Sequence, residues 1–265
     1  MRRPGLAEAL HAEWTKTRTV ASAGWLLLAA IALTVAVGAA AAAAAAGCPS
    51  GAVCQVDPAK VSLTGIGLGQ AVVAIVAVLA ISNEYSTGMI RITLSAMPRR
   101  TVVLAAKAAI LTGLALAAGT IAVLASVLAG RLILSGHGFT AAHGYELLSL
   151  GHGDVLRAAA GSVLYLALIA LLSLGVATAV RDSAVAIGIV LGLLYLFPIV
   201  ANVVGDAQWQ RHLEQIGPMT AGLAIQATTD LSSLPIGPWA GLGVLAAWSA
   251  AALLAGGLVL GLRDA

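Results

Sequence analysis

The stretch "VASAGWLLLAAIALTVAVGAAAAAAAA", residues 20–46, contains no charged residue and is long enough to cross a lipid bilayer. A spanning helix needs about 20 apolar residues, because every backbone polar group inside the hydrocarbon must be paired within its own helix. Five further runs of this kind follow, near residues 62–82, 102–129, 157–180, 184–204 and 238–262. We therefore expect an all-α, polytopic membrane protein with six transmembrane helices that occupy residues 20–265.

The composition agrees with this fold class. Of the 265 residues, 60% are hydrophobic and only 9% are charged, and the mean hydropathy is +0.99. A soluble globular chain has about 25% charged residues. The composition thus excludes a soluble domain, and the small net charge of +3 gives no reason to expect a nucleic-acid partner.

The basic residues indicate the orientation, because loops on the cytoplasmic side carry more Lys and Arg. With the N-terminus inside, the outer side holds four of the 14 basic residues, namely Lys60, Arg131, Arg157 and Arg211. The inner side holds the other ten, namely Arg2, Arg3, Lys16, Arg18, Arg91, Arg99, Arg100, Lys107, Arg181 and Arg263. We expect both termini and segment 83–101 to be cytoplasmic.

Residues 1–19 precede the first span and have an amphipathic pattern. Leu6, Leu10 and Trp14 recur every four residues, and Lys16 and Arg18 follow them. Apolar and aromatic residues with a basic flank are typical of a helix that lies in the membrane interface. The pattern predicts a cytoplasmic amphipathic helix in contact with membrane lipid.

The segment "NEYSTGMIRITLSAMPRR", residues 83–100, is the longest polar interruption between the spans. At 100° per residue, 84–97 forms a helix with one narrow polar stripe. Pro98 would end this helix, and Arg99 and Arg100 would mark the return to the membrane. The stripe consists of Glu84, Thr87, Gly88, Arg91 and Ser95. Either the stripe presents these polar side chains to a partner, or the whole segment is an ordinary interfacial loop.

Several motifs of catalysis are absent from the sequence. None of the lysines Lys16, Lys60 and Lys107 follows a glycine, so the chain has no phosphate-binding loop of the G-x-x-x-x-G-K-[ST] type. The sequence also lacks H-E-x-x-H, G-x-S-x-G and a complete G-x-G-x-x-G. We expect no catalytic residue and no bound cofactor in this chain.

Charged residues within the predicted spans are scarce, which disfavours an autonomous channel or an ion-coupled carrier. Lys107 is the main exception, five or six residues into the third span. A lysine at that depth can extend its ammonium group back to the interface. We expect Lys107 to do so.

Three features fall on the predicted outer side. Cys48 and Cys54 lie in one short loop, where they are either bridged by a disulfide or present as two thiols. His137, His143 and His152 share another outer loop, but their spacings match no compact metal motif, so no metal site is expected. Segment 205–237 is too interrupted to span and too apolar for a solvated linker, and it is a possible re-entrant element.

Two stretches of the chain are informative together, namely "AEWTKTRTV" at 12–20 and an E-Y-x-x-G-x-[IL]-R-x-T-L…P-R-R-like run. With them, and with 155–187 and 237–265, the sequence resembles the permease subunits of ABC-2-type ATP-binding-cassette transporters, especially those of actinobacteria. In this chain the run consists of Glu84, Tyr85, Gly88, Ile90, Arg91, Thr93, Leu94, Pro98, Arg99 and Arg100.

This resemblance implies a function that composition does not. The chain would be the permease subunit of an exporter in the bacterial cell membrane. It would pair with a second permease copy or paralogue, and separate ATPase subunits would bind ATP and Mg. Helix 84–97 would be the coupling helix, with Glu84, Tyr85, Thr87, Gly88, Arg91, Ser95, Pro98, Arg99 and Arg100 at the ATPase interface. The alternative is an ATPase-linked mechanical or regulatory subunit that moves no substrate.

Overall fold

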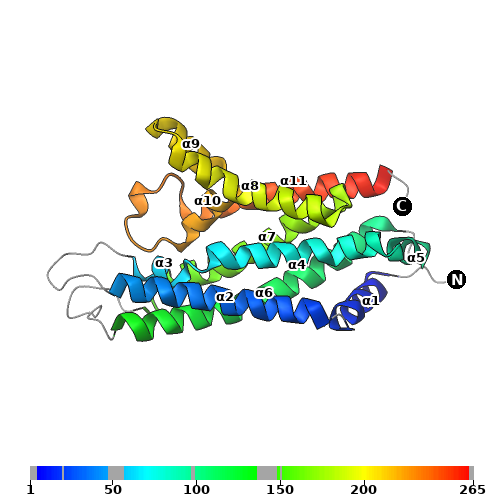
Figure 1. The fold of residues 1–265 in the computed structure, drawn as a ribbon, viewed down its shortest axis with the longest axis horizontal. Helices are drawn as coiled ribbons and strands as arrows, with labels where there is room; N and C mark the ends of the chain where they lie inside the picture. The colour runs from blue at the N-terminus through cyan, green and yellow to red at the C-terminus, as the bar shows by residue number, and fades with distance from the viewer. Residues whose placement is uncertain are drawn as a thin grey trace.

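A computed structural model describes residues 5–19, 21–46, 57–96, 99–135, 148–149 and 151–262. Every regular element in this part of the chain is helical, in line with the predicted all-α class. The long helices run side by side along the longest axis of the molecule (Figure 1). The elements are α1 (Leu6–Thr19), α2 (Ala21–Ala46), α3 (Pro58–Leu63), α4 (Ile66–Ser86), α5 (Met89–Ala96), α6 (Arg100–Ser135), α7 (Gly153–Val180), α8 (Ser183–Val203), α9 (Ala207–Ile216), α10 (Pro218–Leu223), η2 (Ala224–Gln226), η3 (Leu231–Ser233) and α11 (Pro238–Leu262).

Six helical segments of the described chain are long and apolar enough to cross a membrane, so the predicted number of spans is confirmed. The third span is longer than its predicted range, because α6 has 36 residues. At 1.5 Å per residue it is about 54 Å long, whereas the hydrocarbon of a bilayer is about 30 Å thick. The described protein is therefore membrane-embedded, and α6 extends beyond the apolar layer.

The second span is interrupted at Thr64 and Gly65, between α3 and α4. A Cβ atom on Gly65 would lie 1.9 Å from the carbonyl oxygen of Thr34 on α2, and one on Gly69 would lie 1.9 Å from the Thr34 hydroxyl. Small residues at such spacing let two helix backbones approach closely. The break between α3 and α4 therefore lies where the second span packs closely against α2.

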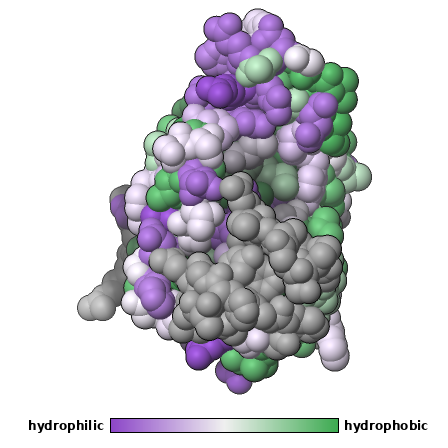
Figure 2. All heavy atoms as spheres, turned by 90° about the vertical axis from the view of Figure 1, so that its left-hand side faces the viewer, coloured by the Kyte–Doolittle hydropathy of each residue, from purple (hydrophilic) through white to green (hydrophobic). Residues whose placement is uncertain are grey.

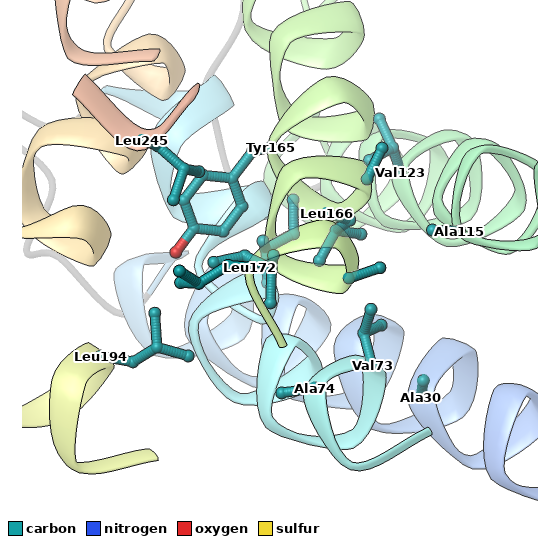
Figure 3. Packing of buried hydrophobic residues seen from close by; sticks show 14 of the residues in the cluster. Ala30, Val73, Ala74, Ala115, Val123, Tyr165, Leu166, Leu172, Leu194 and Leu245 are labelled. Carbon is teal, nitrogen blue, oxygen red and sulfur yellow. The ribbon is translucent and has the colours of Figure 1, made fainter. Parts of the chain in front are cut away.

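Helix α7 lies at the centre of the bundle and packs against α4, α6, α8 and α11. Its Tyr165 is fully buried, and Figure 3 shows this ring beside Leu245 of α11. The Tyr165 hydroxyl donates to Oε1 of Gln70 on α4. Nε2 of Gln70 donates in turn to Sδ of Met219, 3.1 Å away on α10. A polar network thus links two spans to the segment that precedes the last one.

The predicted re-entrant segment 205–237 divides into two parts. Helix α9 contains no buried residue and stands away from the bundle at the upper left of Figure 1. Seen from that end, hydrophilic side chains gather at the top of the molecule and hydrophobic ones along its flank (Figure 2). In contrast, α10 and η2 pack against α7 and α11, with Ile225 fully buried. The segment folds back onto the bundle, and its depth in a membrane stays a prediction.

The two ends of the bundle carry different elements. Helices α1 and α5 lie at one end, together with the end of α11, whereas α3 and α9 lie at the other (Figure 1). The described parts of the predicted segments 1–19 and 83–101 therefore share one end of the molecule, as the sequence requires if both face the same side of a membrane.

Candidate functional site

The predicted single helix over residues 84–97 is wrong, because the chain forms two helices there. Helix α4 continues to Ser86, and α5 begins at Met89. Gly88 between them has a φ of 69°, and the N–H of Thr87 donates to the carbonyl of Asn83 at 3.2 Å. A glycine with positive φ commonly ends a helix. Glu84 therefore belongs to the end of a span, and only 89–96 forms a separate short helix.

Glu84 also points into the bundle instead of outward. It is only 5% exposed, and its Oε1 accepts hydrogen bonds from Lys16 at 2.9 Å and from Lys107 at 3.0 Å. Thr87 and Ser95 of the predicted stripe are exposed. Their hydroxyls donate to carbonyl oxygens of the preceding helical turn, on Asn83 and Ile92. The prediction of one outward stripe is thus wrong for Glu84.

A second buried carboxylate completes a compact group of four charges. Oε2 of Glu13, on α1, lies 2.6 Å from Nζ of Lys107, and its Oε1 lies 2.9 Å from Nζ of Lys16. Each lysine therefore bridges both carboxylates. We refer to Glu13, Lys16, Glu84 and Lys107 as the charge cluster, and its formal charge is zero.

The remaining donors of the two lysines extend the charge cluster. Lys107 donates to the carbonyl of Ala80 at 3.1 Å, and Lys16 donates to Oγ1 of Thr93 on α5 at 3.2 Å. An ammonium group has three donors, so each lysine has a partner for all of them. The charge cluster connects α1, α4, α5 and α6 at one point.

The two α1 members of the charge cluster have shifted pKa values. Burial by itself would raise the pKa of the Glu13 carboxyl, but the charges and hydrogen bonds of Lys107 and Lys16 outweigh this and hold the pKa below its ordinary value. Burial would lower the pKa of Lys16, yet its hydrogen bonds to Glu84 and Glu13 raise it. Both groups are charged at neutral pH.

The expectation that Lys107 reaches the interface is wrong. Lys107 is 4% exposed, because carboxylates on α1 and α4 meet its ammonium inside the bundle. Glu13 is not among the residues predicted from the sequence, although it lies three positions before Lys16 on the same helix. The buried face of α1 carries Ala9 and Glu13, while the apolar side chains of Leu6 and Trp14 are about half exposed, at 52% and 48%.

The other predicted interface residues are dispersed around this end of the bundle. Tyr85 packs against the core, with the guanidinium carbon of Arg181 5.3 Å from its ring centre. Arg100 donates to the carbonyl of Leu260 at 2.6 Å, near the end of α11. Arg99 is exposed. Pro98 and the side chain of Arg91 lie outside the described part of the chain.

Cys48, Cys54, His137 and His143 also lie outside the described residues, so the predicted disulfide stays a prediction. His152 directly precedes α7 and is exposed. Among the residues that the structure describes, no group of three His, Cys, Asp or Glu side chains is placed to hold a metal ion.

Comparison with known proteins gives no further assignment. No family model matches the chain, and no curated protein matches it.

Proposed function

We propose that this protein is the permease subunit of an ATP-binding-cassette exporter. It would form the translocation path as a dimer with a second permease chain, while separate ATPase subunits bind ATP and Mg. One observation carries the proposal most strongly. The short helix α5 lies at the end of the bundle and is joined through Lys16 to a buried charge cluster between three other helices.

This arrangement suits the transmission of force. A push on α5 passes through the contact between Thr93 and Lys16 to Glu13 and Glu84, and from both carboxylates to Lys107 on α6. Charge-assisted hydrogen bonds of this kind are short and strong. Helices α1, α4, α5 and α6 would then move together when ATPase subunits close, as in other rigid-body switches.

The side chains of α5 suggest how an ATPase subunit would bind. Met89 and Ile92 are 42% and 70% exposed, and they are three positions apart, which places both on one helix face. An amphipathic helix with such a face commonly docks into an apolar groove of a partner. The docking surface would consist of Met89 and Ile92, flanked by Thr87, Ser95 and Arg99, while buried Glu84 acts behind it.

The proposed orientation follows from the basic residues counted above. The end of the bundle with α1 and α5 would face the cytoplasm, where ATP is available, and α9 would face outward. The half-exposed Leu6 and Trp14 of α1 would contact membrane lipid in the inner interface.

Co-purification with a candidate ATP-binding-cassette ATPase subunit, co-expressed with this chain, tests the partner. We expect Ile92→Glu to abolish capture of that subunit, because it places a charge in the docking surface. Ile216→Glu is the matched control, since Ile216 is also exposed, at 52%, but lies on α9 at the other end. If Ile92→Glu captures as much of the ATPase subunit as Ile216→Glu does, the α5 docking surface is refuted.

Transport in reconstituted vesicles tests the activity itself. We expect ATP-dependent export of a cargo that requires both subunits. Stable complex formation and stimulated ATP hydrolysis without movement of any cargo would instead assign the chain to a mechanical or regulatory role.

A further inference from the structure

Helix α9 has an apolar half and a polar half. At 100° per residue, Trp209, Leu213 and Ile216 lie within about 60° of one another around the helix axis, while Gln208 and Arg211 lie on the other side. Trp209 is 65% exposed and Ile216 is 52% exposed, and no residue of α9 is buried. Within the described chain, this apolar half is therefore left largely uncovered.

Hydrogen bonds hold α9 at both ends. At its start, Oδ1 of Asp206 accepts from the backbone N–H groups of Gln208 at 2.8 Å and of Trp209 at 3.2 Å. At its end, Nε1 of Trp248 on α11 donates to the carbonyl of Ile216 at 2.9 Å. The direction in which the apolar half points is therefore set by the fold.

The preceding span fixes the level of α9 in a membrane. Helix α8 has 21 residues and is about 32 Å long, which matches the hydrocarbon thickness of about 30 Å. Charged Arg181 and Asp182 directly precede it, so α8 begins at one edge of the apolar layer and ends near the other edge, at Val203.

Helix α9 stays close to that second edge. Only residues 204–206 join it to α8, and it packs against α8. A Cβ atom on Gly217, directly after α9, would lie 2.8 Å from Cβ of Phe197. Phe197 is six positions before Val203, about 9 Å along α8. Interfacial helices bury their apolar face about 5–10 Å into the boundary between headgroups and acyl chains, so α9 lies at the depth of such a helix.

Water, a protein or lipid would cover the apolar half of α9. Water is disfavoured, because a large apolar side chain gains free energy on leaving it. A stable protein interface buries about 800 Å² on each partner, whereas even an aromatic side chain buries only about 150–250 Å². Trp209, Leu213 and Ile216 are too few for such an interface. Lipid needs no minimum area, and Trp is enriched at the membrane interface.

The surface around α9 agrees with this choice. In Figure 1 α9 is the uppermost element, at the end of the bundle that faces the viewer in Figure 2. Seen from that end, hydrophilic side chains gather at the top of the molecule and hydrophobic ones lie along its flank (Figure 2). Polar groups there point along the bundle toward water, and apolar groups point sideways, where lipid lies.

We propose that α9 is an interfacial anchor, whose apolar half inserts among the acyl chains of the leaflet at this end of the bundle. Gln208 and Arg211 then face headgroups and water, and the helix does not reach the middle of the membrane. This inference does not depend on the proposed transport function.

Spin labelling of the full chain in phosphatidylcholine nanodiscs tests the anchor. Both native cysteines are first replaced by serine, and a nitroxide is attached to one new cysteine at a time. Electron paramagnetic resonance then measures collisions of the label with oxygen, which concentrates in lipid, and with a nickel chelate, which stays in water. The four variants are Trp209→Cys, Ile216→Cys, Gln208→Cys and Arg211→Cys.

The two halves of α9 should give opposite results. We expect the labels at positions 209 and 216 to have a higher ratio of oxygen to nickel collisions than those at 208 and 211. Frequent nickel collisions at all four positions would show that water covers the apolar half. Few collisions with either reagent at 209 and 216 would show that a protein covers it, for example a second copy of the chain. Either outcome would overturn the proposal.

Two further labels on α8 calibrate the depth, namely Val203→Cys and Gly192→Cys. Val203 is 80% exposed at the end of the span. Gly192 is exposed, has nothing within 4 Å of a Cβ atom and lies eleven positions earlier, about 16 Å deeper. We expect the labels at 209 and 216 to have an oxygen-to-nickel ratio below that at Gly192. An equal or higher ratio would place α9 in the middle of the membrane and overturn the proposal.

Tryptophan fluorescence of the chain with its native cysteines decides the matter if a labelled variant fails to fold. The difference in emission between the wild type and Trp209→Phe reports on Trp209. We expect phosphatidylcholine brominated near its headgroup to quench this signal more than phosphatidylcholine brominated near its chain ends. Stronger quenching by the deep bromines, or quenching by neither lipid, would overturn the proposal.

Discussion

Lys107 of α6 and Glu84 of α4 form an ion pair of 3.0 Å, although they are 23 positions apart in the sequence. The chain leaves α4 at Gly88, forms α5 and returns as α6, which brings the two side chains together inside the bundle. Glu13 of α1 approaches the same lysine to 2.6 Å. A buried lysine is thus held by carboxylates from two other helices.

Removal of the Lys107 charge should destabilise the fold strongly. Lys107→Met leaves two buried carboxylates with a single counter-charge, and breaking a buried ion pair in this way costs about 3–5 kcal/mol. We expect a free energy of unfolding lower by this amount in a denaturant titration of the purified protein. Lys60→Met is the control, because Lys60 is exposed and surface changes usually stay within about 0.5 kcal/mol. Similar losses in both variants would contradict a special role of the charge cluster.

The stability of the protein should depend on pH at both ends of the range. The pKa of Glu13 is lowered from 4.5. The contribution of the Glu13 carboxylate to the free energy of unfolding is therefore complete above pH 4.5, and it disappears as the pH falls through the folded-state pKa. The pKa of Lys16 is raised from 10.5, so its contribution is complete below that pH and disappears as the pH rises through the folded-state pKa.

This dependence can be measured as the unfolding temperature, Tm, of the wild type and of each variant at a series of pH values. We expect the difference in Tm between the wild type and Glu13→Gln to be constant near neutral pH and to shrink under acidic conditions. The difference from Lys16→Met should shrink under alkaline conditions instead. A difference that does not vary with pH would show that the two side chains act through packing alone.

The close approach of α2 and α4 predicts a rescue. Gly69→Ala places a Cβ atom 1.9 Å from the Thr34 hydroxyl, and overpacking of this kind costs about 1–3 kcal/mol. Thr34→Ala removes the hydroxyl, so the double variant should regain part of the loss. Gly65→Ala should not be rescued, because its Cβ meets the Thr34 backbone carbonyl.

Thermal unfolding of these variants checks the prediction. Gly188→Ala serves as control, since a Cβ at Gly188 meets nothing within 4 Å, and Ala is favoured over Gly in a helix by about 1 kcal/mol. The interpretation fails if Thr34→Ala rescues Gly65→Ala and Gly69→Ala equally well.

Gly88 should tolerate few replacements. Its φ of 69° costs an L-residue about 1–2 kcal/mol, while its surroundings leave open space for a side chain. We expect Gly88→Ala to lower stability by this amount and Gly88→Asn, which adopts positive φ more readily, to lower it less. Equal loss in the two variants, measured by denaturant titration, would argue against backbone strain as the cause.

The spans could be predicted from the sequence with high accuracy. Each of the six helical segments found by length and hydropathy overlaps a predicted range. The prediction worked because the requirement for about 20 apolar residues is local and does not depend on how helices pack. The same reasoning located a short helix between the second and third spans, although it joined α5 to the end of α4 across Gly88.

Glycine spacing shows the same limit. Gly65 and Gly69 are four positions apart, and both lie in close contact with α2. The similar pair Gly188 and Gly192 faces open space in this chain. Spacing shows which glycines share a helix face, but only the packed structure shows whether another helix covers that face.

The sequence by itself determined an all-helical membrane protein with six spans, because hydrophobic length and turn residues act locally. Only the tertiary structure decided that Glu84 points inward, that Lys107 is buried and that Glu13 joins them. A charged residue near the end of a span can reach water or a partner inside the bundle, and the sequence alone leaves both open. The choice depends on which side chains the neighbouring helices bring within about 3 Å, and that is a property of their packing.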